Sequence, residues 1–90
     1  MYNASAYPFA YLKPNVLTTM HITGTITFQD FEGGFWGIIS DDQARFDPVE
    51  GIPHSLQIDG LRVEADVEPA NVMSFRMWGQ SVHLQSIHRL

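Results

Sequence analysis

The sequence predicts an all-β fold, a small closed or partly open barrel of five to six strands with one short helical connection. A long run of alternating apolar and polar residues is interrupted at its middle by Gly24. A glycine there lets one strand bend sharply and serve both sides of a small barrel. Further alternating runs follow, separated by turn-forming residues, and the alternation loosens only between residues 50 and 60.

The first expected strand covers residues 20–28, because its isoleucines face one way and its threonines face the other. Gly33 and Gly34 follow it, and two successive glycines permit a tight reversal. Residues 35–40 then form the second strand of a hairpin.

A polar turn at residues 41–43 leads to a short third strand at 44–49, which is stopped by Pro48. Pro53 is suited to open a short helical turn, and that turn would carry Leu56 toward the core. The helical connection is therefore expected between the third and fourth strands.

Gly60 ends this connection, and residues 61–68 show the clearest alternation in the chain. A further strand is expected at 73–78, with its methionines facing the core and Trp78 on the opposite face. Gly79 then turns the chain.

The last expected strand covers residues 82–90. Its apolar spacing changes from two to three at Gln85 and Ser86, which predicts a β-bulge. The complete order of elements is the one expected of an OB-like barrel formed by residues 17–90. An Sm-like or SH3-like barrel is the main alternative, but no helical period precedes the first strand, where such barrels usually place their helix.

Residues 1–16 form an aromatic N-terminal arm in this interpretation. The segment has four aromatic side chains, two prolines and a single charge. It is too interrupted by proline for a helix and too aromatic for a free linker. The arm either packs on its own barrel or docks on a neighbouring subunit.

The charge balance limits the classes of partner. Ten acidic residues stand against five basic ones, a formal net charge of −5. Such a surface repels phosphate backbones unless its arginines converge on one face. No apolar run approaches the length of a membrane span, and the N-terminus lacks the features of a signal peptide. A cytoplasmic protein without membrane partners is expected, and the absence of cysteine fits a reducing compartment.

The chain resembles a family of small, mostly uncharacterised prokaryotic OB-fold proteins over residues 19–90. The resemblance rests on GTI at 24–26, EGGFWGII at 32–39 followed by two aspartates, DGLRV at 59–63 and SFRMWG at 74–79. It implies an OB fold and a general binding role, and it supplies no catalytic residue. Members usually carry a glycine where this chain has Gln43.

No cofactor is expected. The glycine-rich segment 33–37 lacks the lysine and the helix of a phosphate-binding loop, so it is interpreted as a turn. The four histidines are dispersed, and zinc needs three or four converging ligands. The acids of residues 41–50 lack the spacing of a calcium loop and are interpreted as a solvated hairpin end; they are Asp41, Asp42, Asp47 and Glu50.

The tryptophans are the most informative candidates for binding. Each neighbours a glycine, and each is either an exposed stacking platform or an ordinary cap on an open end of the barrel. The expected contact surface is the face of the second and third strands with the adjoining loops. Its candidate contact residues are Trp36, Arg45, Phe46, Arg76 and Trp78.

The sequence therefore predicts a non-enzymatic binding module. The preferred partner is a protein, including a second copy bound through the arm or through a strand edge. Single-stranded nucleic acid or oligosaccharide on the barrel face is the alternative, and nucleic acid requires the arginines at 45, 62, 76 and 89 to converge beside an exposed aromatic ring. A small hydrolase or metal-dependent enzyme is the remote alternative, since no motif supports it.

Overall fold

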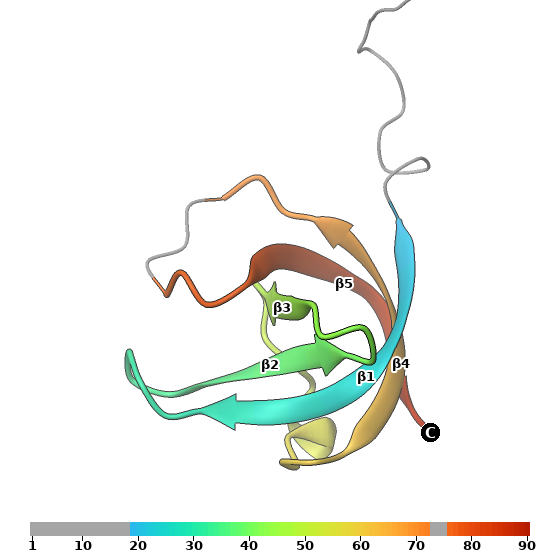
Figure 1. Ribbon diagram of the computed structural model, residues 1–90, viewed down its shortest axis with the longest axis horizontal. Helices are drawn as coiled ribbons and strands as arrows, with labels where there is room; N and C mark the ends of the chain where they lie inside the picture. The colour runs from blue at the N-terminus through green and yellow to red at the C-terminus, as the bar shows by residue number, and fades with distance from the viewer. Residues whose placement is uncertain (1–18, 73–75) are drawn as a thin grey trace, which may run out of the picture.

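Five strands close into one barrel in the computed structural model, which describes residues 19–72 and 76–90 (Figure 1). The strands pair in the order β1-β2-β3-β5-β4, and β4 returns to β1. This is a five-stranded barrel of OB topology, as expected. The predicted N-terminal arm lies outside the described residues. The elements are β1 (Met20–Gln29), β2 (Phe35–Ser40), β3 (Arg45–Pro48), the 3-10 helix η1 (His54–Leu56), β4 (Arg62–Pro69) and β5 (Gln80–Arg89).

Gly24 is the point at which β1 changes partners. It pairs with Ser40 of β2 on one side and with Val63 of β4 on the other. A β-carbon at this position would lie 2.4 Å from the carbonyl oxygen of Ile39 and 2.8 Å from the α-carbon of Ser40. Only glycine allows the bent strand to approach β2 this closely, so the prediction of a bent first strand is confirmed.

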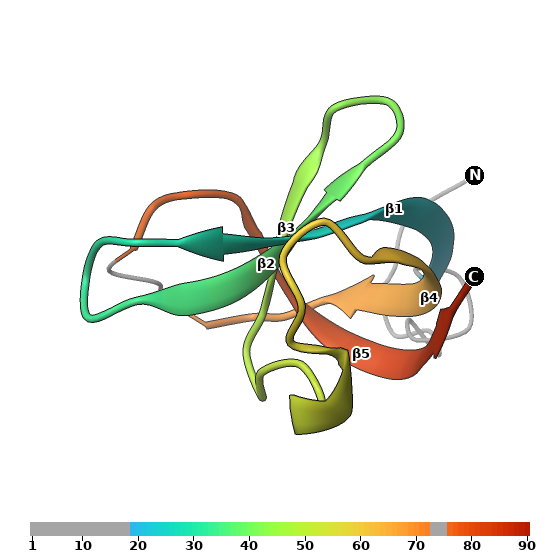
Figure 2. The ribbon, with the colours of Figure 1, turned by 90° about the horizontal axis from the view of Figure 1, so that it is seen from below.

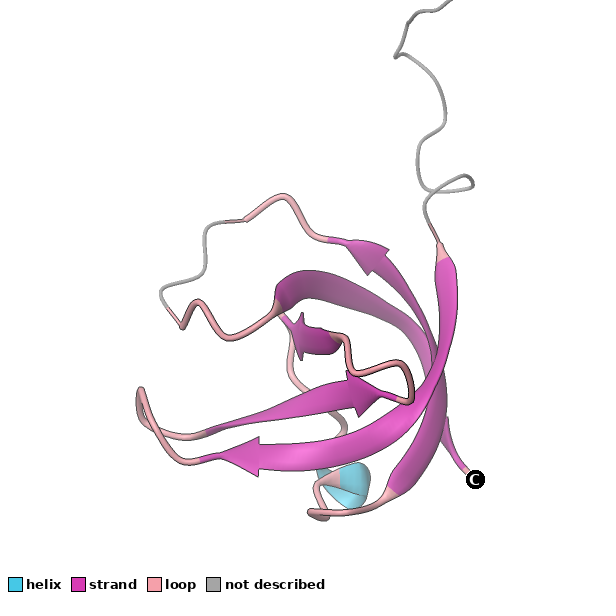
Figure 3. Ribbon diagram, viewed as in Figure 1, coloured by secondary structure: helices cyan, strands magenta, loops and turns pink. Residues whose placement is uncertain are grey.

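The core comes from the alternation in β1, β2 and β4. Ile26, Ile38 and Val63 are fully buried, and Leu56 of η1 packs against them from one end, as expected. The short helical connection is the one helical element of the described chain (Figure 3). The remaining buried members of the cluster are Ile22, Phe46, Ile52, Ala65, Val67 and Val82.

The last strand is bulged where the sequence predicts it. Asp66 pairs with Ser86 and the next residue, Val67, pairs with Leu84, so Gln85 is the extra residue. The bulge moves the inward positions of β5 by one residue and explains the change in apolar spacing. β5 also pairs with β3 in parallel, which closes the ring of strands.

The prediction of a strand at 73–78 is wrong for the part of it that the structure describes. Of this segment, the structure describes residues 76–78, and they form a bend instead of a strand. Met77, expected in the core, is 88% exposed with a positive φ of 51°, whereas Trp78 is only 9% exposed. The two side chains therefore face opposite to the prediction, because Trp78 packs on a distant strand. This packing is what positions the candidate site.

Candidate binding surface

The outer face of β2 and β3 is covered by residues 76–79, which we call the strap. Figures 1 and 2 both place the described end of the connection into β5, residues 76–79, on the side of the barrel from which the β1–β2 hairpin projects. Along β2, Trp36 and Ile38 face the core, so Phe35 and Gly37 face outward. OB barrels use this face and its adjoining loops to hold ligands.

Trp78 lies directly on Gly37. A β-carbon at Gly37 would be 2.4 Å from the indole Cζ3 atom, so no other residue type leaves room for the ring. The ring of Phe35 meets the indole edge-on, with centroids 5.6 Å apart and planes at 75°. On the far side, the guanidinium carbon of Arg45 lies 5.7 Å from the indole centroid. The indole of Trp78 therefore packs against the Phe35 ring, the Arg45 guanidinium and the backbone of Gly37.

Arg76 fixes the other end of the strap. Its Nη1 atom donates a hydrogen bond to Oδ1 of Asp47 at 2.7 Å, and its guanidinium carbon lies 4.3 Å from the centre of the Phe35 ring. Asp47 is 3% exposed. A buried carboxylate needs a cationic or hydrogen-bonding partner, so the strap supplies what this position requires.

Met77 is held away from the barrel between these two anchors. It is 88% exposed, and its left-handed backbone turns it outward while Arg76 and Trp78 reach inward. Phe31, at the tip of the β1–β2 hairpin, is 41% exposed and lies 5.2 Å from Phe35. We call Phe31 and Met77 the loop-end surface; Phe31 packs on Phe35, and Met77 directly precedes Trp78, which packs on the same Phe35 ring.

A second aromatic pair caps the inner side of the hairpin. Phe28 and Trp36 are opposite one another in the register, with ring centroids 5.1 Å apart. Trp36 is half-buried against the core and Phe28 is 43% exposed. Trp36 therefore caps an end of the barrel, which is one of the two alternatives stated above for both tryptophans.

The structure brings together three of the five candidate contact residues. Arg45, Arg76 and Trp78 meet on the outer face of β2 and β3. Trp36 faces inward, and Phe46 is a core side chain with 4% exposure. Phe46 therefore lies beneath the expected contact face and not on it, because its side chain pairs with Ile38 on the core side of β2 and β3.

Gly37, Phe31 and Met77 were not predicted from the sequence as parts of this surface, and Asp47 was not predicted as an anchor. The signal for Gly37 was present, since a glycine flanked by two apolar residues inside a strand often marks a close approach by another group. The partner of Gly37 lies forty-one positions away, at Trp78, so local spacing could not identify it. The expected turn glycines Gly33, Gly34 and Gly60 all have a positive φ, and Gly79 allows the strap to pass over the backbone of Arg45.

The remaining arginines do not join this surface. Arg62 makes a two-pronged ion pair with Asp41, at 2.6 and 2.9 Å, and this contact holds the pKa of Asp41 below its usual range. Arg89 lies at the far end of β5, opposite Val63. The convergence of four arginines that nucleic-acid binding requires is therefore absent from the described barrel.

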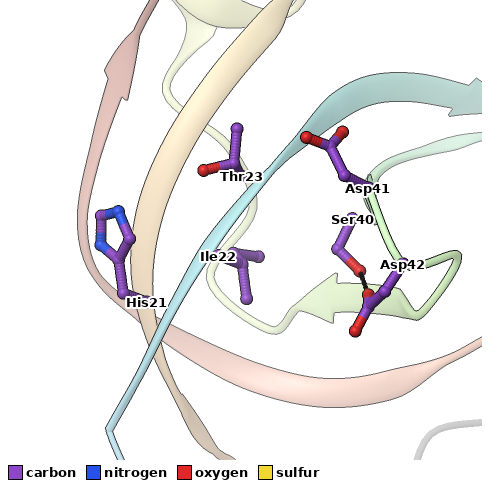
Figure 4. Close-up of a pocket in the computed structure, with 6 residues that line it drawn as sticks. All are labelled: His21, Ile22, Thr23, Ser40, Asp41 and Asp42. Carbon is purple, nitrogen blue, oxygen red and sulfur yellow. Dashed lines mark hydrogen bonds between the residues drawn. The ribbon is translucent and has the colours of Figure 1, made fainter.

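An open pocket of about 240 Å³ lies between the start of β1 and the turn from β2 to β3 (Figure 4). The hydroxyl of Ser40 donates a hydrogen bond to Asp42, which lowers the pKa of that carboxyl. Asp41 is held by Arg62. The pocket's polar groups are thus engaged with the protein itself. It is lined by His21, Ile22, Thr23, Ser40, Asp41 and Asp42.

The expectation that all four acids lie at a solvated hairpin end is wrong for Asp47, which is buried. Asp47 binds Arg76, and Glu50 accepts a hydrogen bond from Nδ1 of His83 at 2.6 Å. Across residues 19–72 and 76–90, no three acidic or histidine side chains are placed to hold a metal ion. None of the helical structure in these residues has the length and apolar character needed to cross a membrane.

Comparisons with known proteins give no relative. No protein-family model matches the chain, and the searches of curated proteins and of solved structures found no significant match.

Proposed function

We propose that the chain is a non-enzymatic binding module whose loop-end surface contacts another protein, with a second copy of the chain as the first partner to test. The observation that carries this proposal is Met77, which is 88% exposed although both of its neighbours are anchored. A left-handed backbone at a non-glycine residue costs roughly 1–2 kcal/mol, and such strain is concentrated at functional positions.

The surroundings of Met77 suit a protein contact. Phe31 adds a second exposed apolar side chain that packs on Phe35, and Met77 is adjacent in the chain to Trp78, which packs on the same ring. Aromatic residues and methionine are enriched at protein interfaces, and a rigid support lowers the entropic cost of binding. Because the barrel is closed, the loop-end surface is favoured over a strand edge.

Single-stranded nucleic acid is less well supported. Two of the four arginines lie on aromatic rings, but Arg76 is paired with Asp47 and the Trp78 ring is covered. With a net charge of −5, two cations offer little attraction to a phosphate backbone. Membership of the resembled family of prokaryotic OB-fold proteins remains part of the proposal and rests on the motifs quoted above.

The test is sedimentation velocity of the full chain over a range of concentrations. We expect self-association that Met77→Asp weakens at least tenfold. Leu90→Asp is the control, because Leu90 is 63% exposed at the C-terminus, on the side of the barrel away from the β1–β2 hairpin (Figures 1 and 2). If the wild type stays monomeric, a photoreactive group is placed at position 77 and the protein is cross-linked in a cell extract. The same group at position 90 is the control. Equal cross-linking at the two positions, together with a monomeric wild type, would contradict the proposal.

A further inference from the structure

The strap presents two chemical groups to the barrel, and they are two residues apart. Arg76 brings a guanidinium to the buried Asp47, and Trp78 brings a ring to the backbone of Gly37. Met77, between them, makes no inward contact and faces solvent. The bent backbone of the strap, left-handed at Met77, brings the side chains of Arg76 and Trp78 inward, so a peptide that takes the same bent backbone, with a cation and an aromatic ring in this spacing, offers the same pair of groups.

We infer that the outer face of β2 and β3 is a peptide-binding site occupied by the chain's own strap, and that its ligand is a peptide with a basic and an aromatic residue two positions apart, bound with the bent backbone that the strap has. The inference rests on the proposed function in one respect, since the partner is again a protein. It concerns the covered face beneath the strap and not the exposed loop-end surface.

The chemistry of the site selects this class of ligand. Lifting the strap leaves the Asp47 carboxylate, now 3% exposed, without Arg76. A phosphate backbone would bring a second negative charge to that carboxylate, whereas an arginine or lysine side chain would restore the pair. The place now filled by the Trp78 indole selects an aromatic side chain, because Gly37, Phe35 and Arg45 surround one planar group there.

The strap then competes with a ligand in trans. A site that is occupied internally binds an external ligand with an affinity reduced by the fraction of molecules in which it is open. Removing the strap's two anchoring side chains should therefore raise the affinity for a peptide that carries the same groups.

The experiment measures binding of the capped pentapeptide RMWGQ, the sequence of residues 76–80, by calorimetry. The proteins are the wild type and the full-length variant carrying both Arg76→Ala and Trp78→Ala. We expect the double variant to bind RMWGQ at least tenfold more tightly than the wild type does. It should bind the control peptides EMWGQ and RMAGQ at least tenfold more weakly than RMWGQ, and Asp47→Asn in the double variant should remove the preference for RMWGQ over EMWGQ.

A folded double variant that binds RMWGQ no better than the wild type, or no better than the control peptides, overturns the inference. If the double variant does not fold, Trp78→Ala alone is tested with indole, which supplies only the ring. Indole should raise the melting temperature of Trp78→Ala and leave that of the wild type unchanged, and equal responses would overturn the inference. Met77 is unchanged in every protein used here. A negative result with the peptides or with indole would therefore not affect the test of the proposed function, which compares Met77→Asp with the wild type.

Discussion

At the scale of single residues, Gln43 shows how a turn tolerates an unfavourable side chain. It has a φ of 74°, and its backbone N–H donates to the carbonyl of Ser40 at 2.8 Å. The resemblance to OB-fold proteins implied a glycine at this position, and the structure gives the physical reason, because the left-handed region favours glycine.

Gln43→Gly is expected to stabilise the protein. A left-handed non-glycine residue costs roughly 1–2 kcal/mol, and the added freedom of glycine in the unfolded chain returns roughly 0.5–1 kcal/mol of that. The net gain should be about 0.5–1 kcal/mol, a rise of several degrees in melting temperature measured by circular dichroism. Gln43→Ala is the control, since it keeps a β-carbon; equal stability of the two variants would show that backbone strain at position 43 is not the cause.

Gly24→Ala is expected to destabilise the barrel. The new methyl group would meet the backbone of β2 at Ile39 and Ser40, which cannot move aside without breaking the strand pairing. A loss of about 1–3 kcal/mol is typical of such overpacking, and chemical denaturation measures it. Thr23→Ala, one residue earlier on the outward face, should cost less; a Gly24→Ala loss no greater than that of Thr23→Ala would refute the close approach of β1 to β2.

At the scale of elements, charged side chains join β1, β4 and β5 across the outside of the barrel. Nδ1 of His21 donates to Asp66 at 2.7 Å, and Nε2 lies 3.3 Å from Glu64. The hydrogen bond to Asp66 is the main cause that raises the pKa of His21, and the same bond lowers the pKa of Asp66. Ser86 of β5 donates to the other oxygen of Asp66, and the charge of His88 also favours the ionised carboxylate.

This contact should make stability depend on pH in a defined window. Because the folded pKa of His21 is raised, its contribution is fully present below the unfolded value near 6.5 and is lost as the pH rises through the folded value. Because the folded pKa of Asp66 is lowered, its contribution is present above the unfolded value near 3.8 and is lost at lower pH. Together, the two groups contribute most between these values.

His21→Gln should therefore lower the melting temperature most at about pH 5, and the difference from the wild type should close at about pH 8.5. Thermal denaturation at the two pH values measures it. His54→Gln, on the exposed helix η1, is the control and should show the same small difference at both. A His21→Gln effect that is equal at pH 5 and pH 8.5 would exclude an ion pair as its cause.

At the scale of the whole molecule, the alternation in the sequence predicted the strands and their partners well where both depend on local spacing. The bend at Gly24 and the bulge at Gln85 are visible as interruptions of a period of two, and both are in the structure. Prediction was wrong at residues 76–78, where the side-chain directions are decided by Gly37 and Asp47, far away in the sequence. The candidate site depends on these long-range contacts. Arg45, Arg76 and Trp78 were therefore predicted as members of the site, but the way in which they pack together was not.

Deleting residues 1–15 should leave the barrel folded, because the described core draws on residues from 22 onward. If the arm docks on a neighbouring subunit, the deletion should also lower the number of copies per assembly, obtained by light scattering as the measured mass divided by the mass of one chain. The far-ultraviolet circular dichroism spectrum provides the check on folding. The same number of copies before and after deletion would show that the arm has no part in self-association.

Proton NMR shows whether Trp78 covers the outer face of the barrel. With the Cζ3–Cη2 edge of the indole against Gly37, we expect nuclear Overhauser effects between the indole ring protons of Trp78 and the α-protons of Gly37, and a ring-current shift of at least one of those α-protons. Gly37 α-protons at ordinary strand positions, without any such effect from Trp78, would show that the face is open and would contradict the account.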